Sequence, residues 1–436
     1  MGYVTVKSSV SSSSVELSKI RSVKGYEVLD SRGTPTVYVE VETQAGHRGY
    51  GYAPSGASTG RREAVELRDG GKRYFGKGVQ KCLEAIKTRV EPQLQSLDVA
   101  DQKEIDAALA GIDGTDNFGS IGANTATAVS IACFRAAASE KGVEPYKIFS
   151  AGPHILPTPM LNIINGGKHA GNGLGIQEFM IVPNGSSFME SLRMAVEVYH
   201  SLKDVLKSEL GAGAINVGDE GGFAPPFTRS RQALDALSRA VKESGYQLGE
   251  DIYFAMDAAA SSFYADGKYV LDGFQREPDS LLDYYLNVCS EYPIISLEDP
   301  FQEDDWGSFA SITKALKGVR IIGDDLLVTN PRNVAKAINT GACNGVIVKV
   351  NQIGTVSKAV ETIELAKTNG WLPIVSHRSG ETEDCFISHL ATGYSTGAMK
   401  SGAPARGERT SKYNELLKIE ANDPHTRFDG ASVFKV

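Results

Sequence analysis

Five apolar runs in the second half of the chain each end in a residue that can carry a charge. They read IYFAMD (252–257), IISLE (294–298), IIGD (321–324), VIVK (346–349) and PIVSH (373–377), and they end in Asp257, Glu298, Asp324, Lys349 and His377. Successive end residues lie 41, 26, 25 and 28 positions apart. A strand, a turn and a covering helix take about 25–30 residues, so most intervals fit one βα unit. The C-terminal strand ends of a βα barrel face one mouth, where we expect these residues to meet.

The three acidic end residues suggest a metal site. One acidic residue after a strand often caps the next helix, but three on successive strands favour a shared role. Carboxylate oxygens without a nearby Cys or His favour Mg²⁺ or Mn²⁺ over zinc. We expect the adjacent acids Asp299 and Asp325 to hydrogen-bond the neighbouring chain or a residue that supports the site.

Lys349 lies within VIVKV (346–350), which reads as a buried strand. A buried lysine is unfavourable unless it is paired or neutralised. Two interpretations remain open. Lys349 forms a structural ion pair with one of the acids, or it is a general base whose pKa is lowered by burial and a nearby metal.

Three glycine-rich loops accompany these strands: SGASTG (55–60), NGGKHAGNG (165–173) and GDEGGFAPP (218–226). Each alone could be an ordinary turn, but together they suggest loops that close over a polar ligand. Glu178 follows the second loop and Glu220 lies in the third. Carboxylates held close together raise one another's pKa, so one of them can act as an acid near neutrality.

Cationic residues follow the last of the five runs. Arg378 and Ser379 come directly after His377, and Lys400 lies 23 residues beyond His377. An arginine offers a planar fork for phosphate or carboxylate, and a lysine offers a point charge. The alternative is that both cations are solvated surface groups. Arg378 fits that alternative less well because it follows a buried strand.

Composition excludes several classes of protein. The chain has 436 residues and a net charge of −8, which disfavours nonspecific nucleic-acid binding but not an anionic substrate beside a metal. Its five cysteines lack a CxxC spacing, which is typical of free thiols in a reducing cytosol. No apolar run approaches the ~18 residues of a membrane helix, and the N-terminus lacks a signal-peptide core. We therefore expect a cytoplasmic protein without membrane or nucleic-acid partners.

The chain divides into parts of different pattern. Residues 1–17 read as a flexible Ser-rich extension, 18–150 as an α+β domain and 151–436 as a βα barrel. The proline-rich stretch GPHILPTP (152–159) supports a boundary near 145–158. In the first domain the patterns predict strands at 36–42 and 48–53 and helices at about 78–96, 103–110 and 123–141. In the second they predict helices at 188–210, from about 331 to 341 and at 355–370, each opened by a capping signal.

At these residues the chain resembles the enolase family over about positions 18–420. The segments that carry the resemblance are DSRGTPTV (30–37), PSGASTG (54–60), NGGKHAGN (165–172), QEFMIVP (177–183), NVGDEGGFAP (216–225), SLEDPFQEDDW (296–306), GDDLLVTNP (323–331), KVNQIGT (349–355), SHRSGETED (376–384) and KSGAP (400–404). The resemblance implies an α/β fold in which an α+β cap precedes a modified TIM barrel. That barrel begins with two strands and two helices before βα alternation sets in.

The resemblance also implies a reaction, the reversible Mg²⁺-dependent dehydration of 2-phosphoglycerate to phosphoenolpyruvate and water in glycolysis and gluconeogenesis. It implies two Mg²⁺ ions per active site and a homodimer or higher homo-oligomer. The first, structural Mg²⁺ would be held by Asp257, Glu298 and Asp324, and the second by Ser58. Lys349 would be the base, and Glu220, supported by Glu178, would be the acid. The rest of the site would be His169 on a closing loop, Gln177 lining the cavity, and His377, Arg378, Ser379 and Lys400 binding the phosphate and carboxylate of the substrate.

Departures from the family pattern are few. Ser262 stands where the family usually has a glutamate, outside the residues assigned to chemistry. Cys385 and His389 lie where other residues are expected, and we predict that they affect packing only. Two alternatives remain: a racemase or cycloisomerase on the same barrel, and a catalytically inactive homologue that serves as a binding protein. The first would have different bases, and the second would have lost a metal ligand or the base.

Overall fold

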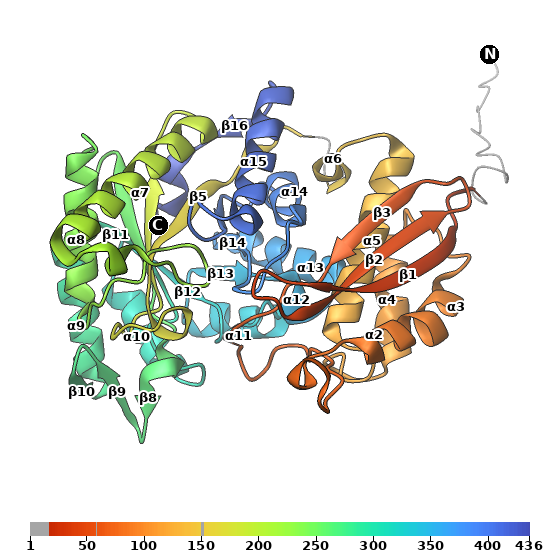
Figure 1. Cartoon of the computed structure of the whole chain (residues 1–436), viewed down its shortest axis with the longest axis horizontal. Helices are drawn as coiled ribbons and strands as arrows, with labels where there is room; N and C mark the ends of the chain where they lie inside the picture. The colour runs from red at the N-terminus through yellow and green to blue at the C-terminus, as the bar shows by residue number, and fades with distance from the viewer. Residues whose placement is uncertain (1–16, 58, 150–151) are drawn as a thin grey trace, which may run out of the picture.

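The computed structural model describes residues 17–57, 59–149 and 152–436. The predicted N-terminal extension therefore lies outside the described residues apart from Leu17. A three-stranded antiparallel sheet and a layer of helices form the first part, and a closed barrel surrounded by helices forms the second (Figure 1). The sheet comprises β1 (Ile20–Leu29), β2 (Pro35–Thr43) and β3 (Arg48–Tyr52). Its helices are α2 (Gln80–Ala85), α3 (Glu91–Leu94), α4 (Gln102–Asp113), α5 (Ala123–Lys141) and α6 (Pro145–Phe149).

The alanine-rich helix α5 packs unusually close to the sheet. A Cβ atom on Gly49 of β3 would lie 2.1 Å from the carbonyl oxygen of Ala132, and one on Gly51 would lie 2.2 Å from that of Ala128. Glycine on the strand and alanine on the helix thus allow their backbones to meet directly. The alanine pattern that predicted the helix is also the reason that it packs at this distance.

The barrel closes in the order β11-β12-β13-β14-β15-β5-β6-β7. Along the chain, β6 is the second strand of the barrel, and it runs antiparallel to its neighbours β5 and β7. The other neighbouring pairs of barrel strands are parallel. Its strands are β5 (Thr158–Asn165), β6 (Glu178–Pro183), β7 (Ile252–Asp257), β11 (Ile294–Glu298), β12 (Arg320–Gly323), β13 (Gly345–Val348), β14 (Leu372–Ser376) and β15 (Ala398–Lys400). Two helices follow β5 and β6 before β7, so the expected start of two strands and two helices is confirmed.

Helices form the outer layer of the barrel (Figure 1). They are α7 (Phe188–Leu210), α8 (Ser230–Glu243), α9 (Pro278–Glu291), α10 (Trp306–Ala315), α11 (Pro331–Thr340), α12 (Val350–Ile353), α13 (Val356–Thr368), α14 (Phe386–Gly393) and α15 (Gly407–Asn422). The short strands β4 (Ile155–Leu156) and β16 (Arg427–Phe428) pair beside them. Two of the three predicted caps are present: the Ser187 side chain accepts from Glu190 N–H, and that of Asn330 accepts from Arg332 N–H. The third is wrong, because the Thr355 side chain makes no capping hydrogen bond.

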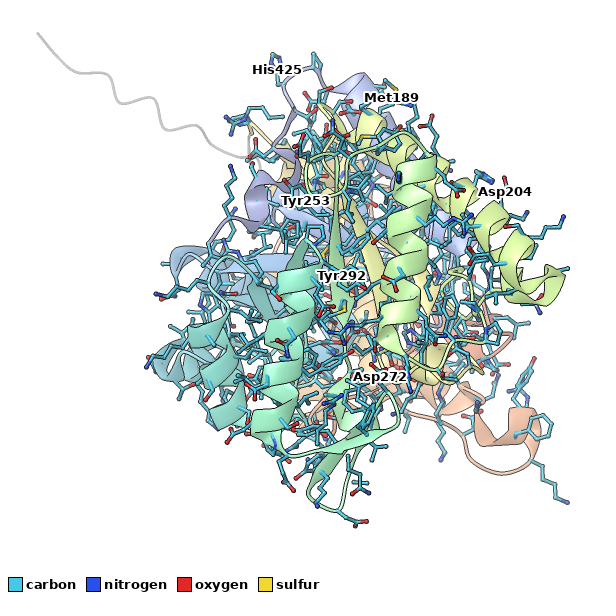
Figure 2. The ribbon with its side chains drawn as sticks, turned by 90° about the vertical axis from the view of Figure 1, so that its left-hand side faces the viewer. Met189, Asp204, Tyr253, Asp272, Tyr292 and His425 are labelled. Atoms are coloured by element: carbon cyan, nitrogen blue, oxygen red, sulfur yellow. The ribbon has the colours of Figure 1, made fainter. Side chains whose placement is uncertain are left out.

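A small sheet explains why Asp257 and Glu298 are 41 positions apart. Strands β8 (Tyr264–Ala265), β9 (Lys268–Leu271) and β10 (Phe274–Arg276) are inserted between β7 and α9. Asp272, in the turn between β9 and β10, accepts from the backbone N–H of Ser230 at 2.8 Å and from the Tyr284 hydroxyl at 2.9 Å. It thereby ties the inserted sheet to α8 and α9 (Figure 2).

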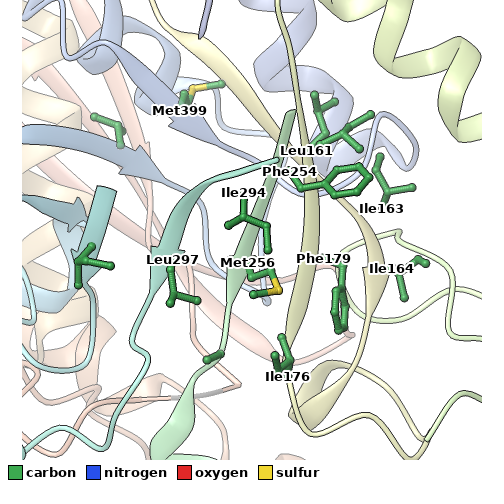
Figure 3. Packing of buried hydrophobic residues seen from close by; sticks show 14 of the residues in the cluster. Leu161, Ile163, Ile164, Ile176, Phe179, Phe254, Met256, Ile294, Leu297 and Met399 are labelled. Carbon is green, nitrogen blue, oxygen red and sulfur yellow. The ribbon is translucent and has the colours of Figure 1, made fainter. Parts of the chain in front are cut away.

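Barrel strands bury both faces, in two separate apolar layers. Ala255, Ile322, Ile347 and Ala398 belong to the cluster inside the barrel. Side chains between strands and helices form the larger outer cluster, part of which is drawn in Figure 3. Successive strand side chains alternate between faces, so the residue two positions after an interior residue also faces the interior. Those positions hold Asp257, Asp324, Lys349 and Lys400. Because strand side chains alternate between the two faces, these four charged side chains all point into the same mouth of the barrel.

Buried polar contacts join the cap to the barrel. Arg135 of α5 donates to both carboxylate oxygens of Asp384 at 2.8 and 2.6 Å, and both side chains are less than one-tenth exposed. Ser55 and Gly380 exchange two backbone hydrogen bonds of 2.8 Å each. The cap is therefore held against the segment that follows β14, where Arg378 and Ser379 lie.

We predict that Arg135→Ala lowers the free energy of unfolding by about 3–5 kcal/mol, because it leaves Asp384 buried without its partner. Denaturant titration measures this loss. Arg239→Ala is the matched control, since its partners Glu209 and Glu243 are exposed and such pairs contribute about 0–1 kcal/mol. Equal effects of the two substitutions would contradict the assignment of the buried pair as a main cap–barrel contact.

Candidate active site

The five predicted end residues meet at one mouth of the barrel. Asp257 and Glu298 are the last residues of β7 and β11 and stand opposite each other in the sheet register. Asp324, Lys349 and His377 directly follow their strands. A small cavity opens here. The predicted site residues that line it are His169, Gln177, Glu178, Glu220, Asp257, Asp324, Lys349, His377, Arg378, Ser379 and Lys400.

Of the predicted site residues that the structure describes, Glu298 alone is absent from that lining. Its side chain is fully buried, and Lys400, which lines the cavity, donates to Glu298 Oε2 at 2.8 Å. Ser58 lies outside the described residues, so its predicted place in the site stays a prediction.

Lys400 is the centre of a buried charge cluster. Its Nζ lies 2.8 Å from Glu298 Oε2, 3.2 Å from Glu178 Oε2 and 3.4 Å from Asp257 Oδ2. Burial lowers the pKa of Lys400, but the surrounding carboxylates outweigh burial and raise it well above its usual value. Lys400 is therefore a permanent cation, and the alternative of a solvated surface lysine is wrong.

Lys349 makes an ion pair with Asp324. Burial lowers the pKa of Lys349, as predicted, but the nearby carboxylates, led by Asp324, together outweigh burial, so the net direction is upward. The predicted net lowering is therefore wrong for the protein without a metal. Its physical reason is that Asp324, an expected metal ligand, is itself the counter-ion of the lysine.

Asp324 is held in place by Gln352 and Thr329, to which the sequence analysis assigned no role, and by Asp299, whose role it predicted. Gln352 Nε2 donates to Asp324 Oδ1 at 2.9 Å, and the Thr329 hydroxyl donates to Gln352 Oε1 at 2.7 Å. Asp299 accepts from the backbone N–H groups of Asp324 and Asp325 at 2.9 and 2.7 Å. The prediction that Asp299 hydrogen-bonds the neighbouring chain is confirmed.

Glu178 and Glu220 form a close carboxylate pair around His169. The His169 Nδ1 atom lies 3.5 Å from Glu220 Oε1 and 3.8 Å from Glu178 Oε1. Burial and the charge of Glu220 raise the pKa of Glu178 well above its usual value. Burial also pushes the pKa of Glu220 upward, but its neighbours His169, His377 and Arg409 together outweigh burial and hold it well below its usual value. These opposite directions favour a proton on Glu178 beside an ionised Glu220.

The loops that carry these groups pack tightly together. A Cβ atom on Gly218 would lie 2.4 Å from the carbonyl oxygen of His169, so the loops at 165–173 and 218–226 meet backbone to backbone. Asn162 of β5 donates to Glu220 Oε2 at 2.8 Å. Glycine at position 218 is required by this close approach.

Arg378 is buried, and a residue of the cap orients it. Its Nη1 donates to Glu63 Oε2 at 2.8 Å and to Asn351 Oδ1 at 3.1 Å. Ser379 Oγ accepts from the backbone N–H of Ala57 at 2.6 Å, which joins the predicted phosphate-binding residues to the first glycine-rich loop. Arg378 is therefore no surface group.

Arg409 of α15 supports the other side of the His377–Ser379 segment. Its Nη1 lies 2.6 Å from His377 Nδ1 and donates to the Arg378 carbonyl at 2.6 Å. Its side chain is fully buried. Sequence reasoning missed Arg409, Glu63 and Gln352; Gln352 stood within the quoted segment KVNQIGT, whereas the other two had no local signal.

The donor set suits a hard divalent cation. Buried acids at the mouth outnumber buried cations, and burial raises the pKa of several of them, including Glu298 and Asp299 well above normal and Asp325 to about 7. The acids are Glu178, Glu220, Asp257, Glu298, Asp299, Asp324 and Asp325. Extra positive charge would relieve this repulsion, and carboxylate oxygens are ligands that Mg²⁺ prefers. Asp257, Glu298 and Asp324 fit such an ion.

A βα barrel whose strand ends bring carboxylates and lysines into one mouth has the layout of an enzyme active site. Comparison with known proteins identifies the family. The profile "Enolase, N-terminal domain" matches residues 20–149, and "Enolase, C-terminal TIM barrel domain" matches residues 153–436. The chain belongs to the enolase family, and its activity is that of phosphopyruvate hydratase, a lyase. The resemblance stated from the sequence is confirmed.

Several relatives support this assignment. The enolase of Methanocaldococcus jannaschii is 50% identical over 404 residues, which cover 92% of this chain and 95% of that protein. The enolase of Methanococcus aeolicus is 49% identical over 418 residues, covering 95% and 98%. That of Aeropyrum pernix is 51% identical over 404 residues, covering 92% and 94%. The racemase, cycloisomerase and inactive-homologue alternatives are therefore set aside.

In the described part of the chain no helix is both long and apolar enough to cross a bilayer. All five cysteines are free, as predicted.

We predict that His377 stays neutral through pH 5, because burial lowers its pKa to about 3. Imidazole NMR should show no titration of this ring between pH 8 and 5, with His377→Asn identifying its signals. The unfolded value is about 6.5, so the stability that the neutral ring provides is complete above that pH. It is lost as the pH falls toward 3, by at most about 1.4 kcal/mol per pH unit. A midpoint near 6.5 would contradict the prediction.

Proposed function

We propose that Lys349 and Glu220 act as base and acid on opposite sides of 2-phosphoglycerate. The observation that supports this most strongly is their separate environments in one cavity. Lys349 pairs with the carboxylate Asp324, and Glu220 pairs with Glu178 and two histidines. An elimination needs such a division, because the proton leaves from one carbon and hydroxide leaves from the next.

In the first step the Lys349 amine takes the proton from C2, and the electron pair of the C–H bond moves into the substrate carboxylate. That carboxylate then carries a second negative charge, which Lys400 is placed to stabilise. Lys349 must be neutral to accept a proton. When Asp324 is a metal ligand, its charge no longer fixes the lysine proton, and burial lowers the pKa of Lys349.

In the second step the electron pair forms the C2–C3 double bond, and the C3–O bond breaks. Glu220 donates its proton to the departing hydroxyl, which leaves as water, and phosphoenolpyruvate remains. The proton retained by the Glu178–Glu220 pair is the source. Hydroxide is a poor leaving group, so a proton donor at this position is required.

Substrate binding falls to the remaining residues. Arg378 and Ser379 would bind the phosphate, with His377 beside them, and Gln177 would line the cavity next to Asp257. His169 would approach when its loop closes. Glu63 would keep the Arg378 guanidinium plane aligned with the phosphate, which couples phosphate binding to the cap.

Two Mg²⁺ ions complete the proposed site, the first held by Asp257, Glu298 and Asp324 and the second by Ser58 together with the substrate phosphate. When bound, they supply positive charge that makes the C2 proton more acidic. We also propose a homodimer in the cytoplasm and the division into residues 1–17, 18–150 and 151–436. The family resemblance and the sequence pattern support these proposals.

Isotope exchange tests the two roles separately. With 2-phosphoglycerate and Mg²⁺ in D₂O, Lys349→Ala should lower the rates of both hydrogen exchange at C2 and phosphoenolpyruvate formation by orders of magnitude. Glu220→Gln should retain C2 exchange while product formation falls about 10²–10⁴-fold, the usual contribution of a general acid.

NMR follows the exchange, and ultraviolet absorbance follows the product. Lys317→Ala, a substitution in the segment between α10 and β12, is the control and should leave both unchanged. A near-normal exchange rate in Lys349→Ala would contradict the assignment of the base. Equal losses of C2 exchange and product formation in Glu220→Gln would contradict the assignment of the acid.

A further inference from the structure

A second cluster of metal-ligating side chains lies outside the active site. Cys385 directly precedes α14, His389 lies one helical turn later, and Glu415 lies on the neighbouring helix α15 (Figure 1). One potential ligand atom from each lies within 4.8 Å of the other two. None of the three lines the active-site cavity. Cys385 and His389 were noted above as departures from the family pattern, with packing as the only expected effect.

His389 is buried without its full set of partners. Only 4% of the residue is exposed, and no described residue hydrogen-bonds its Nδ1 atom. Its Nε2 atom lies 3.4 Å from Glu415 Oε1. Burial lowers the pKa of the imidazole to about 4, so the ring is neutral at physiological pH, as a metal ligand must be. The Nε2 atom, which faces Glu415, is the ring nitrogen available to an ion at this cluster.

The Glu415 carboxylate has one oxygen available on the side of His389. Lys418 donates to Oε2 at 2.7 Å, which leaves Oε1 toward the imidazole. Such a lysine contact keeps the carboxylate ionised and oriented, as outer partners of metal ligands do. Neither Cys385 nor Glu415 is fully buried, so an ion can enter from solvent.

A buried cation close to the cluster, Arg135, does not block it. Arg135 lies near Cys385, but it is paired with both oxygens of Asp384. That pair is close to neutral as a unit, so an incoming dication does not meet an uncompensated guanidinium.

The distances suit a tetrahedral ion with nitrogen, oxygen and sulfur ligands. Zinc lies at about 2.0–2.1 Å from nitrogen and 2.0–2.2 Å from carboxylate oxygen, which places two such ligands about 3.4 Å apart. That is the observed separation of His389 Nε2 and Glu415 Oε1. The thiolate, at about 2.3 Å from zinc, would approach from its present place in the cluster by on the order of 1 Å.

We propose that Cys385, His389 and Glu415 bind one borderline-soft divalent cation of the zinc type, with water as the fourth ligand. Binding converts the Cys385 thiol to a thiolate and releases its proton to solvent. Burial raises the pKa of this thiol to about 11, so binding should strengthen as the pH rises. The ligand types separate this ion from the one expected at the barrel mouth, whose expected protein ligands are the carboxylates Asp257, Glu298 and Asp324.

Cobalt(II) is the probe, because a cobalt–thiolate bond gives a near-ultraviolet charge-transfer band that oxygen ligands alone do not give. The full-length protein is saturated with Mg²⁺ to occupy the active-site carboxylates and then titrated with Co²⁺. We expect one equivalent with the thiolate band, and Zn²⁺ should displace it. Cys385→Ser should abolish the band. His389→Asn should weaken binding by at least about 10-fold, the smaller of the effects known for metal-site partners.

Cys289→Ser is the matched control, since Cys289 is also partly buried but belongs to no ligand cluster of the described residues. It should keep the band and the affinity. Retained turnover of 2-phosphoglycerate shows that each variant is folded. A wild-type protein without the band, a band that survives Cys385→Ser, or equal loss in Cys289→Ser would overturn the proposal.

Discussion

The active site depends on one electrostatic constraint: more carboxylates are buried at the barrel mouth than the protein's own cations can neutralise. Burial disfavours the charged form of each acid, and each also repels its neighbours. The structure offsets part of this with Lys400, which contacts Glu178, Asp257 and Glu298, and with Lys349, which pairs with Asp324. The negative charge that these lysines do not offset is neutralised by protons or by bound cations. The same imbalance suits a reaction whose intermediate adds negative charge, because that reaction requires cations at this place.

The cap and the barrel share the task of fixing this charge cluster. The barrel supplies the charges through the alternation of its strands, and the cap holds the phosphate-binding segment. Glu63 orients Arg378, and Ala57 donates to Ser379. On the side of this segment away from the cap, Arg409 contacts His377 and donates to the Arg378 carbonyl. A change at the cap–barrel interface should therefore alter the active site without touching a catalytic group.

Much of the site could be predicted because its residues follow local rules. The apolar runs end where the strands end, so Asp257, Glu298, Asp324 and Lys349 were placed correctly from spacing alone. The long interval before Glu298 was not explained, since the β8–β10 insertion has no signal in the apolar pattern. Strand β1 and the supporting residues Glu63 and Arg409 were missed because their roles come from contacts between distant segments. The pKa direction of Lys349 was wrong because it depends on the position of a counter-ion, which a sequence does not contain.

The most direct test of this electrostatic account is the thermal unfolding of the protein with and without Mg²⁺, compared between the wild type and Asp324→Asn. The account predicts that Mg²⁺ stabilises the wild type, by about 2.7 kcal/mol at one hundred times its dissociation constant. The stabilisation should be absent from Asp324→Asn and retained in Asp235→Asn, whose carboxylate accepts from Tyr292 on the outer helices. A wild type that Mg²⁺ does not stabilise, or equal stabilisation of wild type and Asp324→Asn, would contradict the account.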